Sequence, residues 1–94
     1  MNKADVKPRV KIYTRTGCPY CTTALDILKY RDIPYEEVNI YGPDEPKLRD
    51  EIAGLTGGRS DVPQIFIDGK HIGDDDDLEA WEKAGKLEAL KEAR

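Results

Sequence analysis

The fold is set most clearly by the segment RVKIYTRTGCPYCTTALDILKYR, residues 9–31. Residues 9–14 alternate charged and apolar side chains and are rich in β-branched and aromatic types, which predicts a strand. Gly17 interrupts this pattern, and from Pro19 the apolar residues recur at helical spacing. Pro19 suits the first helical position, where a missing N–H costs nothing. The chain is therefore expected to open with a strand that leads directly into a helix, with two cysteines at the junction.

Outward from this segment, strand and helix patterns keep alternating. Asp68-Gly69 predicts a hairpin turn between the last two strands. The order β-α-β-α-β-β-α predicts an α/β fold, a four-stranded mixed sheet flanked by helices, in a single domain over residues 1–94 with residues 1–8 as a flexible extension. The further strands are predicted at 35–40, 62–67 and 70–72, and the further helices at 44–56, 74–84 and 86–94.

Apolar spacing also predicts which side chains point inward. In the helix at 44–56, Asp44 is expected as the cap, with Leu48, Ile52 and Leu55 buried. Trp81 is expected in the core, and His71 is expected to be a partly exposed sheet residue. Four tyrosines are expected to pack against the edges of the sheet: residues 13, 30, 35 and 41.

Composition excludes several classes of function. The 94 residues carry 15 Lys and Arg against 19 Asp and Glu, a net charge of −4, which argues against nucleic acid binding because that needs a basic surface. No apolar run approaches the ~18 residues of a membrane span, and the first eight residues lack the apolar region of a secretory signal. We expect a cytoplasmic monomer that binds neither nucleic acid nor membranes.

The chain has only two cysteines, Cys18 and Cys21. A secreted domain stapled by disulfides would carry more of them, spread along its length. Cys18 is predicted next to the helix N-terminus, where unpaired N–H groups stabilise a thiolate and lower the thiol pKa. Cys21 lies one turn further on the same helix face. We therefore expect redox catalysis, with Cys18 attacking and Cys21 resolving.

Other readings of the cysteine pair are weaker. Zinc needs four ligands, and the chain adds only His71 and carboxylates, so a metal half-site shared between two chains stays open but no metal is expected. Haem attachment is excluded because Thr22 follows Cys21. A purely structural disulfide over so short a loop would add little stability. The acidic run at 74–77 lacks the spacing of a calcium loop and is expected to cap a helix.

With Cys-Pro-Tyr-Cys at 18–21 in this setting, the chain resembles the glutaredoxins, most closely the short dithiol members from bacteria. Further matching segments are IYTR at 12–15, VPQIFIDG at 62–69, HIG at 71–73 and DDL at 76–78. The resemblance runs from about residue 10 to residue 90. It implies a thioredoxin-like fold and a glutathione-dependent thiol–disulfide oxidoreductase, with glutathione as the reductant.

The resemblance also implies where glutathione binds. Pro63 is expected in the cis form facing the sulfurs, and the Val62 backbone is expected to pair with the cysteinyl part of glutathione. Arg15 is expected to meet the glycine carboxylate. At the γ-glutamyl end, N–H groups of the last helix suit the carboxylate, and an acid suits the ammonium. The remaining implied glutathione-binding residues are Tyr20, Asp61, Gly73, Asp75 and Asp76.

Two positions depart from the family pattern. Asp61 replaces a threonine, and a carboxylate close to Cys18 is expected to raise the pKa of that thiol. Asp74 replaces a glycine, which would be strained if the backbone there needed a positive φ. Both changes bear on glutathione affinity and substrate preference.

The enzyme hypothesis has one competitor from another class. Some glutaredoxins form dimers around a [2Fe–2S] cluster through the first cysteine, here Cys18, together with two glutathiones. Pro19 stiffens the loop and disfavours that assembly in the family. For the enzyme, the expected partners are disulfide-containing or glutathionylated proteins, with ribonucleotide reductase, a peroxidase and arsenate reductase as candidates.

Overall fold

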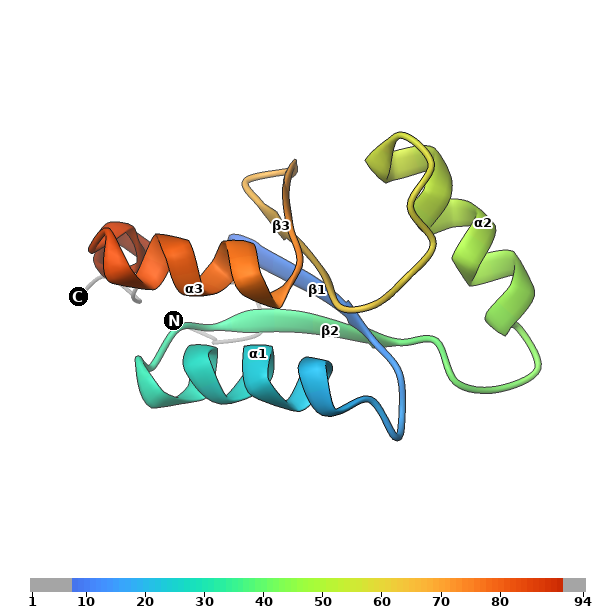
Figure 1. Ribbon diagram of the computed structural model, residues 1–94, viewed down its shortest axis with the longest axis horizontal. Coiled ribbons are helices and arrows are strands. Elements are labelled where there is room, and N and C mark those ends of the chain that lie inside the picture. Colours follow the sequence, from blue (N-terminus) through green and yellow to red (C-terminus); the bar gives the residue numbers. More distant parts are fainter. Residues whose placement is uncertain (1–7, 91–94) are drawn as a thin grey trace, which may run out of the picture.

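The computed structural model describes residues 8–90 (Figure 1). Most of the expected N-terminal extension and the end of the expected last helix lie outside these residues. The element order confirms the sequence prediction and ends in a short 3-10 helix, η2. The elements are β1 (Val10–Thr14), α1 (Pro19–Tyr30), β2 (Tyr35–Asn39), α2 (Glu45–Thr56), β3 (Gln64–Ile67), β4 (Lys70–Gly73), α3 (Asp75–Lys83) and η2 (Lys86–Leu90).

The four strands form one mixed sheet in the order β2-β1-β3-β4. β1 pairs with β2 in parallel, while β1 with β3 and β3 with β4 pair antiparallel. β3 begins at Gln64, two residues later than predicted, because Pro63 has no N–H to donate to a strand ladder. Asp68 and Gly69 have φ values of 53° and 81°, which confirms the hairpin turn between β3 and β4.

The core has two parts, one on each face of the sheet. Alternate residues of β1 point to opposite faces, so Ile12 packs with α1 and α3 while Tyr13 packs with Ile52 of α2. α1 and α3 contact each other, whereas α2 stands apart from both (Figure 1). This arrangement leaves the loops before α1, before β3 and before α3 to gather at one end of the molecule.

Several predicted burials are wrong. Leu55 lies in the last turn of α2 beside an open hollow and is 52% exposed. Tyr13 is buried in the core rather than at a sheet edge, while Tyr30, at the end of α1, and Tyr41 are exposed. Trp81 is only partly buried against the core, because it lies one turn beyond the buried Leu78, towards the end of α3. Tyr35 packs against the core as expected, the predicted burial of Ile52 is confirmed, and Leu48 is partly buried.

The N-terminal caps of the helices lie where the sequence predicts them. Asp44 is the N-cap residue of α2, although its side chain makes no capping hydrogen bond. Cys18 caps α1 and Asp74 caps α3, and both cap through their side chains. No helix within residues 8–90 combines the length and the apolar character that crossing a bilayer requires.

Candidate active site

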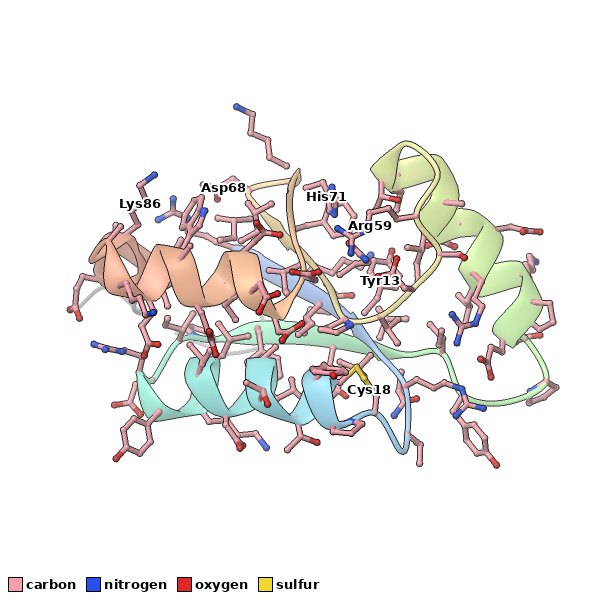
Figure 2. The ribbon with its side chains drawn as sticks, in the orientation of Figure 1. Tyr13, Cys18, Arg59, Asp68, His71 and Lys86 are labelled. Atoms are coloured by element: carbon pink, nitrogen blue, oxygen red, sulfur yellow. A yellow bond between two sulfur atoms is a disulfide. The ribbon has the colours of Figure 1, made fainter. Side chains whose placement is uncertain are left out.

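Cys18 and Cys21 form a disulfide at the N-terminal end of α1 (Figure 2). Cys18 is the N-cap residue, and its Sγ accepts a hydrogen bond from the Cys21 N–H at 3.1 Å. Cys18 is partly exposed, whereas Cys21 is 2% exposed. The helix thus presents the first sulfur to solvent and keeps the second one behind it. That is the arrangement an attacking and a resolving cysteine need.

The loop before β3 faces the first sulfur. Cys18 Sγ lies 3.9 Å from the Val62 carbonyl oxygen, and the Val62–Pro63 peptide bond is cis, as the resemblance implied. Beneath the loop, the fully buried Gln64 donates through Nε2 to the Asp61 carbonyl at 3.0 Å. Its Oε1 lies 2.7 Å from Nε2 of the partly buried His71. The single histidine is thus a partly exposed residue of β4, as expected.

Arg15 lies in the loop that leads to Cys18 and is held by α2. Its Nε donates to Glu45 Oε2 at 2.8 Å, and its guanidinium lies 4.8 Å from the ring of Tyr41. The same carboxylate pairs with Arg49, which also donates to the Ser60 carbonyl at 2.7 Å. The hydrogen bond from Arg15 is the largest cause that lowers the pKa of Glu45. Arg15, where the resemblance predicts a ligand for glutathione, is thus held by a carboxylate that it shares with Arg49.

The two departures from the family pattern are joined by one arginine, Arg59. Its Nη2 lies 2.8 Å from Asp61 Oδ2 and 3.1 Å from Asp74 Oδ2. The hydrogen bond from Arg59 is the main cause that lowers the pKa of Asp61. Burial raises the pKa of Asp74, but hydrogen bonds from Arg59 and from the Asp77 amide outweigh it, so this pKa is also lowered. Asp61 therefore does not stand near the sulfurs as an unpaired charge.

Asp74 also begins α3 without backbone strain. Its φ of −108° is accessible to any residue, and the positive φ of +128° belongs to Gly73. A side chain at Gly73 would overlap the carboxylate of Asp77, so the glycine is required there. Asp74 Oδ1 accepts the N–H groups of Asp76 at 3.1 Å and Asp77 at 3.4 Å. The Asp77 side chain accepts the Asp74 N–H in return at 3.1 Å, which completes a capping box.

Most of the predicted site residues line one of two hollows. Arg15 lines one of about 420 Å³ together with Cys18 and Cys21. Pro63 is buried at the end of the loop before β3, and Gly73 is buried at the end of β4; neither is among the residues that line these two hollows. The other hollow, about 310 Å³, is lined by Tyr20, Asp61, Val62, Asp74, Asp75 and Asp76. Within residues 8–90, His, Cys, Asp and Glu side chains form no group that could hold a metal ion.

Replacing Arg59 by methionine tests how much its ion pairs stabilise the fold, when the stability of the variant and the wild type is compared at two pH values. In the folded protein the pKa values of Asp61 and Asp74 lie below the ordinary 3.8. The ion pairs therefore contribute their full stabilisation above that pH, and this contribution to the unfolding free energy is lost as the pH falls through the folded pKa values. These groups are partly exposed, so we expect the variant to lose about 1 kcal/mol or less of unfolding free energy at neutral pH. Near roughly pH 2 the two proteins are expected to unfold alike.

Thermal unfolding of both proteins at the two pH values measures this difference, with Arg59→Lys as the control that keeps the charge. A loss of the same size at both pH values would contradict the prediction, because it would show that Arg59 stabilises by packing rather than by charge.

A thioredoxin-like fold with a dithiol at the start of its first helix defines the class of thiol–disulfide oxidoreductases. The sequence model of the family described as Glutaredoxin matches residues 10–72. The chain belongs to the glutaredoxin family, and its function is glutathione-dependent thiol–disulfide exchange through the Cys18/Cys21 dithiol.

Known relatives agree over nearly the whole chain. The glutaredoxin of Pseudomonas aeruginosa is 44% identical over 86 residues, which cover 92% of this chain and 99% of that protein. The solution structure of the glutaredoxin from Brucella melitensis is 42% identical, with a TM-score of 0.73 over 89% of each chain. The crystal structure of a buckwheat glutaredoxin–glutathione complex is 25% identical, with a TM-score of 0.79 over 87% of this chain and 74% of that one.

Proposed function

We propose that Cys18 is the attacking cysteine and Cys21 the resolving cysteine in reduction of protein disulfides and glutathione mixed disulfides. The observation that carries this assignment is the capping geometry of α1. The partly exposed Cys18 Sγ accepts the Cys21 N–H, while Cys21 is buried behind it. A thiolate at Cys18 is stabilised by that N–H and by the positive end of the helix dipole.

In the monothiol cycle, the Cys18 thiolate attacks the glutathione sulfur of a mixed disulfide. The bond to the substrate sulfur breaks, and that sulfur leaves with the electron pair and takes up a proton. A second glutathione thiolate then attacks the glutathione sulfur bound to Cys18. Oxidised glutathione forms, and the Cys18 thiolate is released. In each step one S–S bond forms as another breaks, so the electrons balance.

In the dithiol cycle, Cys18 first forms a mixed disulfide with a protein substrate. Cys21 then attacks Cys18 and releases the reduced substrate, so that the disulfide seen in the structure forms. Two glutathione molecules return this disulfide to the dithiol. Glutaredoxin potentials of roughly −200 to −230 mV lie where the cytosolic glutathione pool can drive this step.

Glutathione is proposed to bind across the two hollows beside the disulfide. The buckwheat relative, which was crystallised with glutathione, supports this ligand. Val62 would pair its backbone with the cysteinyl part and Tyr20, 65% exposed, would flank the ligand. Asp75 and Asp76 would face the γ-glutamyl ammonium, and burial is the main cause that raises the pKa of Asp75. Arg15 would have to share its charge between Glu45 and the glycine carboxylate.

The protein partners follow from this chemistry. We propose disulfide-containing or glutathionylated proteins, with ribonucleotide reductase among the candidates. We propose a cytoplasmic location because that compartment maintains the reduced glutathione that the cycle consumes. A monomer is sufficient, since both cysteines and both hollows belong to one chain.

Reduction of a glutathionylated peptide tests this function. The protein is supplied with reduced glutathione, and release of oxidised glutathione is followed with a coupled reductase. We expect turnover well above the uncatalysed exchange. Absence of turnover would refute the proposed cycle. In that case a brown colour with visible absorbance in the purified protein would instead support the cluster carrier.

A further inference from the structure

Asp74 places its own carboxylate at the N-terminus of α3. The first amides of a helix have no partner within the helix and attract anions. In this chain Asp74 Oδ1 already accepts two of them, the N–H groups of Asp76 and Asp77. These amides belong to the part of α3 that borders the 310 Å³ hollow, beside Tyr20.

Asp74 is held in this place through its backbone and through its carboxylate. Asp77 accepts the Asp74 N–H, and Arg59 donates to Asp74 Oδ2 at 3.1 Å. Arg59 also pairs with Asp61 in its own loop, so the ion pair between Arg59 and Asp74 ties the cap of α3 to the loop that carries Val62. Figure 2 shows Arg59 between that loop and the start of α3. The Asp74 side chain is 26% exposed, far less than Asp61 at 59%.

We propose that Asp74 is a specificity-determining residue that competes with the γ-glutamyl carboxylate of glutathione for the amides at the start of α3. The inference rests on the proposed glutathione cycle and deepens it. A ligand carboxylate and the Asp74 carboxylate need the same N–H donors, and two like charges so close repel each other. The site therefore binds glutathione less tightly than a chain with glycine at this position.

A substrate without a γ-glutamyl group is not subject to this competition. The first step at Cys18 needs only access to the sulfur, and a disulfide in an ordinary peptide does not present a carboxylate to α3. Asp74 thus shifts the preference of the enzyme away from glutathione mixed disulfides and toward protein disulfides.

Replacing Asp74 by glycine tests the proposal, because it should strengthen ligand binding while it weakens the fold. Binding of S-methylglutathione, which cannot exchange disulfides, is measured by calorimetry. We expect roughly tenfold tighter binding, since one recovered hydrogen bond to a charged group is worth about that factor. Glycine at an N-cap costs only about a few tenths of a kcal/mol, so the Tm is expected to fall by about 1–3 °C. KM for a glutathionylated peptide should fall together with the dissociation constant of S-methylglutathione. The rate of reduction of a peptide disulfide that contains no glutathione should not increase.

Asp74→Asn distinguishes two effects of Asp74: the hydrogen bonds that its side chain makes with the α3 amides, and its negative charge. Asparagine is as good a helix cap as aspartate, so this variant keeps the amides occupied. It removes the negative charge, and with it both the repulsion and the ion pair with Arg59. We expect about threefold tighter binding, between wild type and glycine. Asp44→Gly is the matched control, because Asp44 is also an N-cap residue but makes no capping hydrogen bond. It should change neither the binding nor the Tm appreciably.

Unchanged or weaker binding in Asp74→Gly overturns the proposal, as does equal binding in Asp74→Gly and Asp74→Asn, because charge alone would then explain the effect. If the glycine variant is too unstable to assay, unchanged binding in Asp74→Asn overturns it instead. The proposed function fails separately, through absent turnover of glutathionylated peptide by the wild type, and the binding comparison does not depend on turnover.

Discussion

Replacing Cys18 by serine is expected to lower turnover of a glutathionylated peptide on the order of a thousandfold or more. A hydroxyl at this position keeps an acceptor for the Cys21 N–H, so α1 stays capped. What the variant loses is the nucleophile, because a serine oxygen is not ionised near neutral pH and does not exchange with disulfides. The measurement is release of oxidised glutathione under saturating peptide and glutathione.

Cys21→Ser is the matched control for this prediction. It removes a sulfur from the same helix turn but leaves the attacking thiol in place. We expect it to keep reducing the glutathionylated peptide while it loses most of its activity on a protein disulfide, which needs the resolving thiol. Equal losses in the two variants on the glutathionylated peptide would contradict the assignment of Cys18 and Cys21.

Replacing Leu28 by alanine is expected to remove about 2–5 kcal/mol from the free energy of unfolding. Leu28 is fully buried where α1 packs on the sheet and on α3. The substitution leaves a cavity in the larger half of the core, and the loss is a large part of the ~5–15 kcal/mol that stabilises a typical domain. Denaturation in urea, with the slope compared between the two proteins, measures it.

Leu55→Ala makes the same chemical change on the surface. Leu55 is 52% exposed at the end of α2, so the expected loss is within about 0.5 kcal/mol. If both variants lost the same free energy, the division between the buried face of α1 and the exposed end of α2 would be incorrect.

Local patterns in the sequence were sufficient to predict the architecture. The alternation in β1 separates Ile12 from Tyr13 onto opposite faces, and the break at Gly17 followed by Pro19 marks the start of α1. Burial was harder to predict near helix ends. Leu55 follows the helical period, but α2 ends at Thr56, and the period does not say whether a last turn still overlies the sheet.

The ion pairs around the site could not be predicted in the same way. Arg15 meets Glu45 thirty residues along the chain, and Arg59 meets Asp74 fifteen residues along. Such pairs depend on how loops meet at one end of the sheet, which no local period encodes. The sequence identified Asp61 and Asp74 as unusual through the family resemblance, but it gave no sign that both would pair with Arg59.

The cap of α1 also connects helix stability with electron transfer. Cys18 Sγ is the atom that accepts a hydrogen bond from the Cys21 N–H, in the first turn of the helix, in the disulfide form. A thiolate formed from the same sulfur after reduction would be a stronger acceptor for that amide. Any free energy that this bond gains on reduction stabilises the reduced form and so raises the reduction potential of the pair. The hydrogen bond at the start of α1 therefore helps to set the reduction potential of the Cys18/Cys21 pair.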